Sequence, residues 1–113
     1  MEKIKKYCFD LDGVICTANK KGNYSSSKPI KKNINKINEL FNKGNVIIIF
    51  TARFMGRNND EKIKAKKQAY NITITQLKKW NVKYNKLIFG KPSYDLIIDD
   101  KALFFKKNWT KYI

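Results

Sequence analysis

Apolar runs over residues 4–11 and 46–50 predict the first two strands of the chain, and shorter runs at 86–89 and 95–98 predict two more. The 46–50 run is β-branched or aromatic at every position. A strand that is apolar on both faces is typical of the centre of a parallel sheet, where packed layers cover both of its sides. This run therefore predicts the central strand of the fold.

Between these runs, apolar residues recur at the spacing of a helix. One apolar face is formed by Ile30, Ile34, Ile37, Leu40 and Phe41. It predicts a helix that begins near Pro29 and ends at Gly44. We expect a lysine-rich helix over residues 60–70 and a separate short helix over 73–80, because Thr73-Ile74-Thr75-Gln76 has the spacing of a capping box. A final helix is expected at 102–107, and the tail at 109–113 has no assigned element.

Strands that alternate with helices indicate an α/β fold. We predict a small three-layer Rossmann-like domain with a mostly parallel sheet. The 113 residues fit one domain, residues 1–113, without a second domain that could cover a substrate.

The composition limits the possible chemistry. The chain has no histidine, which excludes a His-based catalytic triad, and Cys8 and Cys16 form no metal-type pair. Reduced thiols are typical of the cytoplasm. No apolar run reaches the roughly 20 residues that span a bilayer, so we expect a cytoplasmic protein without membrane contact.

The formal net charge is +16, from 25 lysines and arginines against nine acidic residues. Such a charge is compatible with a nucleic-acid partner. The lysines are dispersed, however, and only Arg53 and Arg57 are arginines, which favours a compositional bias. These two arginines flank a glycine-containing loop and are candidate substrate contacts.

Polar residues follow three of the predicted strands. Asp10 and Asp12 follow the first strand, Thr51 the second, and Asp99 and Asp100 the run at 95–98. The carboxyl ends of parallel strands meet at one edge, where α/β proteins bind ligands. Clustered carboxylates without histidine or thiolate ligands suit a hard cation such as Mg²⁺.

These motifs, taken in order, resemble those of the haloacid dehalogenase (HAD) superfamily. Asp10-Leu11-Asp12-Gly13-Val14 resembles the first motif, Ile49-Phe50-Thr51-Ala52-Arg53 the second, and Ile97-Ile98-Asp99-Asp100 the fourth. Lys91, in Gly90-Lys91-Pro92, is the candidate for the third. The resemblance covers nearly the whole chain and implies a HAD-like phosphatase fold.

The resemblance also implies a catalytic mechanism. Asp10 would attack the phosphoryl group and form an aspartyl-phosphate, while Asp12 would act as general acid and then as general base. Thr51 would hydrogen-bond a phosphoryl oxygen, and Lys91 would offset negative charge.

The same resemblance implies the metal ligands. Mg²⁺ would be held by the Asp10 side chain, the Asp12 backbone carbonyl and Asp99, with Asp100 binding directly or through water.

The chain departs from the family pattern in two respects. Lys91 precedes Asp99 by only eight positions, so Arg53 or Lys101 could take its role. The chain also lacks room for the usual cap domain and looks like the cap-less branch of the family. Its members act on large substrates or borrow a cover from a neighbouring subunit, so we expect a homo-oligomer.

A narrower resemblance is to short HAD-type proteins of capsular or other surface polysaccharide biosynthesis. It rests on Phe50-Thr51-Ala52-Arg53, Gln76-Leu77 and Gly90-Lys91-Pro92-Ser93, followed by Asp99-Asp100-Lys101-Ala102. The first functional hypothesis is a phosphatase of a small phosphorylated metabolite such as a phosphosugar. The alternatives are a nucleotide or polynucleotide phosphatase and a non-catalytic binding module on a HAD fold.

Overall fold

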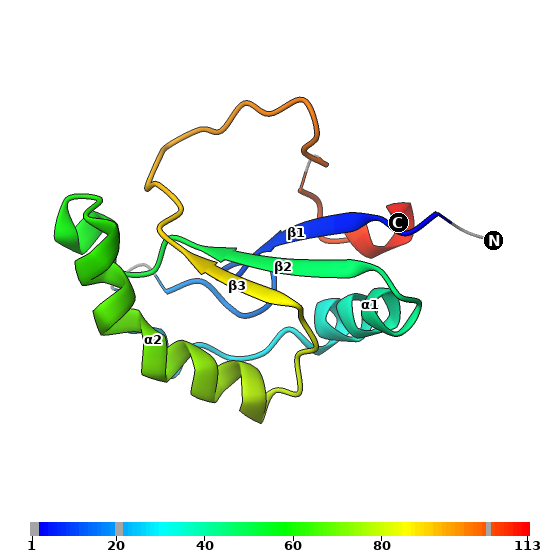
Figure 1. Ribbon diagram of the computed structural model, residues 1–113, viewed down its shortest axis with the longest axis horizontal. Helices are drawn as coiled ribbons and strands as arrows, with labels where there is room; N and C mark the ends of the chain where they lie inside the picture. The colour runs from blue at the N-terminus through cyan, green and yellow to red at the C-terminus, as the bar shows by residue number, and fades with distance from the viewer. Residues whose placement is uncertain (1–2, 20–21, 104) are drawn as a thin grey trace.

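The computed structural model describes residues 3–19, 22–103 and 105–113, and its centre is a parallel sheet of three strands (Figure 1). The strands β1 (Lys6–Asp10), β2 (Val46–Thr51) and β3 (Lys86–Phe89) lie in the order β1-β2-β3. The register places Asp10 opposite Phe50 and Thr51 opposite Phe89. The predicted central position of residues 46–50 is confirmed.

Two helices cover one face of the sheet: α1 (Lys31–Asn42) and α2 (Lys62–Lys79), both on the same side in Figure 1. Helix α1 has the predicted position, and Gly44, with a φ of +92°, turns the chain into β2. On the opposite side the described residues contain no α-helix, and the segment after Gly90 passes there instead. The expected third layer is thus irregular rather than helical.

The two predicted helices at 60–70 and 73–80 are one continuous helix, so the separate capping box was wrong. Thr73 and Gln76 lie inside α2 and are buried. Their polar groups bind another side chain, as described below, instead of capping a helix start. The spacing of a capping box is thus also that of two residues on one helix face.

The hydrophobic core lies between the sheet and the helices. Side chains from β1, β2, α1 and α2 form it, and the C-terminal tail closes one end through Trp109 in the 3₁₀ helix η3 (Trp109–Tyr112). The Trp109 ring lies 5.5 Å from that of Phe9. The core residues are Phe9, Leu11, Ile15, Cys16, Ile34, Ile37, Leu40, Ile47, Ile49, Leu77, Val82 and Trp109.

The predicted strand at 95–98 and helix at 102–107 do not form among the described residues; Phe104 lies outside them. Gly90, with a φ of +92°, turns the chain away from β3, and Pro92 has no backbone N–H to donate to a neighbouring strand. In Figure 1 the following segment arches away from the sheet. Ile98 is 91% exposed as a result.

The overall architecture is nevertheless the predicted one, a small α/β domain with a parallel sheet. Within the described ranges, no helix is long and apolar enough to cross a membrane.

Candidate active site

Asp10 and Lys91 meet at the carboxyl edge of the sheet. Asp10 is the last residue of β1, and its Oδ1 accepts a hydrogen bond of 2.9 Å from the backbone N–H of Leu11. The Lys91 ammonium lies 3.6 Å from the same oxygen. Lys91 is fixed in place because its backbone N–H donates to the Thr51 carbonyl at 3.1 Å. The structure therefore joins the ends of all three strands at these residues.

The environment changes the titration of both partners. Burial raises the pKa of the Asp10 carboxyl, and the Lys91 ammonium opposes this only in part. For Lys91, burial acts to lower the pKa, but hydrogen bonding with Tyr94 and the charge of Asp10 outweigh it and raise the pKa. The environment therefore favours the charged form of Lys91. Additional positive charge near Asp10 would stabilise its carboxylate form.

Asp12 lies on the turn after β1 and binds Arg53. The Nε of Arg53 donates to both Asp12 oxygens, at 3.2 Å to Oδ1 and 3.0 Å to Oδ2, and Nη2 donates to Oδ1 at 3.0 Å. The Arg53 side chain is fully buried, and that of Asp12 is 20% exposed. Gly13, with a φ of +93°, forms the predicted turn, in which its N–H donates to the Cys16 carbonyl at 2.7 Å.

Thr51 ends β2 beside these groups and is 1% exposed. Its Oγ1 accepts a hydrogen bond of 3.1 Å from the backbone N–H of Arg53. That bond uses a lone pair of the hydroxyl and leaves its proton to another acceptor.

The structure does not bring Asp99 and Asp100 to this cluster. Both are exposed and lie on the segment that arches away from the sheet. The Asp99 side chain accepts a hydrogen bond of 2.9 Å from the nearby Lys101 backbone. Across the described ranges, no three Asp, Glu, Cys or His side chains gather as a metal site would require.

The arginines predicted to touch substrate differ in position. Arg57 is exposed on the 3₁₀ helix η2 (Gly56–Asn58), where its guanidinium lies 4.5 Å from the centre of the Phe54 ring. Arg53, by contrast, directs its guanidinium inward to Asp12. Arg57 is thus accessible to solvent, whereas the Arg53 guanidinium is buried against Asp12.

Four residues of the site were missed by the sequence analysis. Thr73 and Gln76 accept hydrogen bonds from Arg53 Nη1 at 3.2 and 2.6 Å, and the Tyr24 ring lies 4.8 Å from the guanidinium. The Cys16 thiol contacts Asp12 Oδ1 at 3.4 Å. Burial, together with the Asp12 charge, raises the pKa of Cys16 to about 12, so this thiol is a hydrogen-bond donor and not a nucleophile.

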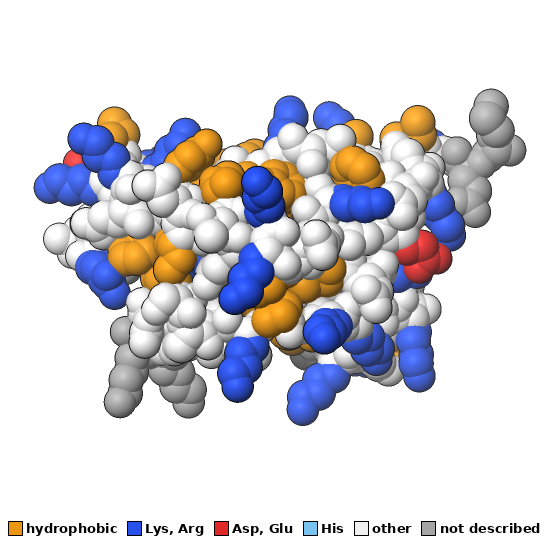
Figure 2. All heavy atoms as spheres, turned by 90° about the horizontal axis from the view of Figure 1, so that it is seen from below, with side chains coloured by type: hydrophobic (Ala, Val, Ile, Leu, Met, Phe, Trp, Pro, Cys, Tyr) orange, Lys and Arg blue, Asp and Glu red, His pale blue; other side chains and the backbone are white. Residues whose placement is uncertain are grey.

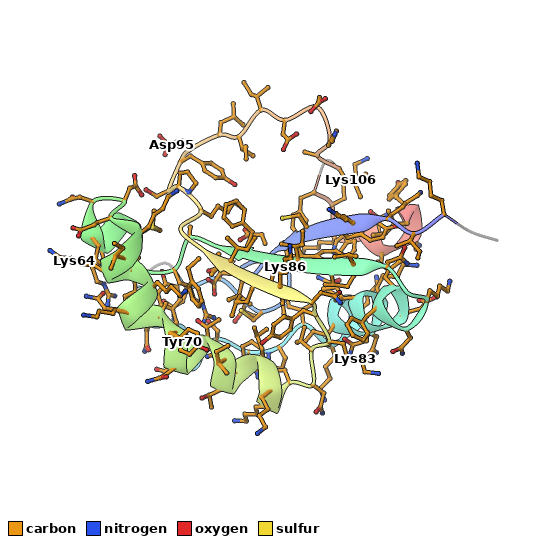
Figure 3. All side chains as sticks on the ribbon, in the orientation of Figure 1. Lys64, Tyr70, Lys83, Lys86, Asp95 and Lys106 are labelled. Atoms are coloured by element: carbon orange, nitrogen blue, oxygen red, sulfur yellow. The ribbon has the colours of Figure 1, made fainter. Side chains whose placement is uncertain are left out.

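The positive charge is spread over the surface. Figure 2, which views the molecule from below, shows lysine and arginine side chains scattered over the face, with apolar side chains between them. In Figure 3, Lys64 lies on α2, Lys83 in the connection that follows α2, and Lys86 at the start of β3. This distribution matches the dispersed lysines of the sequence.

Comparisons with known proteins give the fold and no activity. No family model matches the chain, and no curated protein matches it. The crystal structure of an MCSG target from Vibrio cholerae is similar, with a TM-score of 0.81 and 27% sequence identity. The match covers 96% of this chain and 95% of that one. The α/β fold therefore recurs over the full length of a crystallised chain.

Proposed function

We propose that this chain is a magnesium-dependent phosphomonoesterase of the HAD type that works through an aspartyl-phosphate. The observation that carries the proposal is the meeting of Asp10 and Lys91, at 3.6 Å, where three parallel strands end. A carboxylate on a rigid strand end beside a cation is suited to attack on a phosphoryl group.

The bond changes and proton transfers of the reaction involve side chains already described. A carboxylate oxygen of Asp10 forms a bond to phosphorus as the bond from phosphorus to the leaving oxygen breaks. Asp12 carries a proton when the substrate binds, gives it to that leaving oxygen, and so becomes the carboxylate that pairs with Arg53. Asp12 then takes a proton from water, which attacks phosphorus and releases phosphate from Asp10. Thr51 donates to a phosphoryl oxygen, and Lys91 offsets its charge.

The donor set at Asp10 fits a hard cation. Its oxygens are carboxylate oxygens, and the raised pKa of Asp10 indicates that Lys91 alone does not compensate for burial. In this proposal the Asp10 side chain and the Asp12 backbone carbonyl would hold Mg²⁺. Asp99, with Asp100 binding directly or through water, would join them only after the segment beyond Gly90 moves toward the sheet. The metal would supply positive charge to the phosphoryl oxygens.

We propose a small phosphorylated metabolite as substrate, such as a phosphosugar of surface polysaccharide synthesis. The narrower resemblance supports this substrate, and the dispersed lysines favour it over a nucleic acid. The described residues form no cap domain over the site, so in this proposal a second copy would cover it and exclude water from it.

The test is phosphate release from para-nitrophenyl phosphate with Mg²⁺ and with EDTA. We expect EDTA to abolish release, and Asp10→Asn to reduce it by at least about 10³-fold while the circular dichroism spectrum is kept. The matched control is Asp95→Asn, on the exposed loop beyond β3 (Figure 3), which should keep full activity. Turnover by Asp10→Asn close to that of the wild type would contradict the covalent mechanism.

A further inference from the structure

Arg53 directs its N–H donors into the protein interior. Besides the contacts with Asp12, Nη1 donates to Thr73 Oγ1 and Gln76 Oε1, and Nη2 lies 3.6 Å from Cys16 Sγ. A guanidinium has five N–H donors in one plane, and here they bind groups from two segments of the chain, the turn after β1 and helix α2. The orientation of the guanidinium is therefore fixed by Asp12 on one side and by Thr73 and Gln76 on the other.

The charge of this guanidinium is balanced by one carboxylate. Thr73, Gln76 and Cys16 are neutral partners, whereas Asp12 is the anion within ion-pair distance, at 3.0 Å. A fully buried cation is costly unless an anion pairs with it. Separating Asp12 from Arg53 would leave this buried charge unpaired, so the ion pair is favoured. Helix α2 fixes the guanidinium through the hydrogen bonds to Thr73 and Gln76.

The two Asp12 oxygens are not equivalent. Oδ1 accepts from Arg53 Nε, Arg53 Nη2 and the Cys16 thiol. In the described part of the chain, Oδ2 accepts only from Arg53 Nε, at 3.0 Å. Oδ2 thus keeps a lone pair for a proton, while Oδ1 is the anchored oxygen.

The same guanidinium supports the 3₁₀ helix η1 (Tyr24–Ser26), in the segment between β1 and α1. The Tyr24 ring packs on Arg53, and the Tyr24 carbonyl accepts a hydrogen bond of 2.6 Å from Gln76 Nε2. The Tyr24 ring also lies 4.9 Å from that of Phe54, which has a φ of +63°. A positive φ at an aromatic residue is strained and persists only where packing enforces it.

We propose that Arg53 is a positioning residue that aims Oδ2 of Asp12 at the leaving oxygen of the substrate. This inference rests on the proposed function, because it concerns the proton that Asp12 transfers. Arg53 is proposed to touch no atom of the substrate and to act through its hydrogen bonds to Asp12. Its neighbours Thr73, Gln76 and Tyr24 keep the guanidinium in one orientation.

The test compares two substrates in the Arg53→Lys variant. Lysine keeps the charge but cannot make the bidentate contact and the contact with α2 together. An alkyl phosphate needs a proton on its leaving oxygen, whereas para-nitrophenyl phosphate needs it far less. We expect kcat for the alkyl phosphate to fall about 10- to 100-fold further than kcat for the aryl phosphate, since general acid catalysis contributes about 10²- to 10⁴-fold.

Two further variants keep the test decisive if Arg53→Lys does not fold. Gln76→Leu should show the same bias against the alkyl phosphate, because it removes the 2.6 Å bond that holds Nη1. Thr73→Val should show a weaker bias. The matched control is Thr75→Val, an exposed position on α2, which should leave the ratio of the two kcat values unchanged.

The outcomes separate this inference from the proposed function. Equal losses on both substrates in Arg53→Lys or Gln76→Leu, with an active wild type, would overturn the positioning role and leave the phosphatase intact. A wild-type protein that releases phosphate from neither substrate would overturn both.

Discussion

Two apolar runs of this chain, at 46–50 and 96–98, have similar sequences and opposite environments. In β2, Ile49 is 0% exposed, with β1 on one side and β3 on the other. In the later run, Ile98 is 91% exposed. The difference shows that a β-branched run becomes a strand only where a neighbouring strand can take up its backbone hydrogen bonds.

The comparison extends to the candidate site. Asp10, Thr51 and Lys91 follow paired strands and lie together, whereas Asp99 and Asp100 follow the unpaired run and lie apart from them. The part of the site proposed to carry the nucleophile is thus fixed by the sheet. The part proposed to complete the metal ligands depends on the segment after Gly90.

The largest expected effect is on hydrogen exchange. Among the described residues, none accepts a hydrogen bond from the backbone N–H groups of residues 94–98. We expect the amides of β2 to exchange at least about 10³-fold more slowly than those of 94–98, because β2 opens only when the domain unfolds. Mass spectrometry of peptic fragments measures both segments in one sample. Equal protection of the two runs would show that 94–98 is paired.

A matched pair of substitutions tests the packing of the two runs. Ile49→Ala should lower the free energy of unfolding by about 2–5 kcal/mol, since it leaves a cavity in the core. Ile98→Ala removes the same atoms from an exposed site and should change the free energy of unfolding by less than about 0.5 kcal/mol. Urea unfolding followed by circular dichroism gives both values. A large loss in Ile98→Ala would place this side chain in a core.

The smallest expected effect concerns the metal. Asp99→Ala should raise the Mg²⁺ concentration needed for half-maximal activity by about 10- to 100-fold, and Asp100→Ala by less. The reason is that the family resemblance implies a direct bond from Asp99 to Mg²⁺, whereas Asp100 would bind Mg²⁺ directly or through water. A Mg²⁺ titration with the reverse order would show that the two aspartates were assigned the wrong way round.

The sequence predicted the fold wherever short-range pattern and long-range packing agree. The strands at 46–50 and 86–89 and the helix ending at Gly44 are confirmed, and Ile47, Ile49, Ile34 and Ile37 lie in the core that the pattern implies. The strand at 95–98 was wrong, because the pattern does not reveal whether a neighbouring strand lies alongside. The division of α2 into two helices was wrong. Thr73 and Gln76 do not cap a helix; their side chains accept hydrogen bonds from Arg53 inside one continuous helix.

The site was predictable where its residues end strands. The meeting of Asp10, Thr51 and Lys91 follows from a parallel sheet, in which every carboxyl end lies at the same edge. The pairing of Asp12 with Arg53 does not, since the two residues lie 41 positions apart in the chain. The signal that was available is the position of Arg53, two residues after the buried end of the central strand β2, where a long side chain lies in the interior.

The two ion pairs of the site have a consequence for how a substrate enters. Asp10 with Lys91 and Asp12 with Arg53 make four side chains whose formal charges sum to zero when both aspartates are ionised. With Asp12 protonated, as the proposed acid step requires, they sum to one positive charge, which is less than the almost two negative charges of a phosphomonoester near neutral pH. A divalent cation supplies the remaining positive charge. Substrate and Mg²⁺ would therefore strengthen each other's binding, each being the counterion of the other.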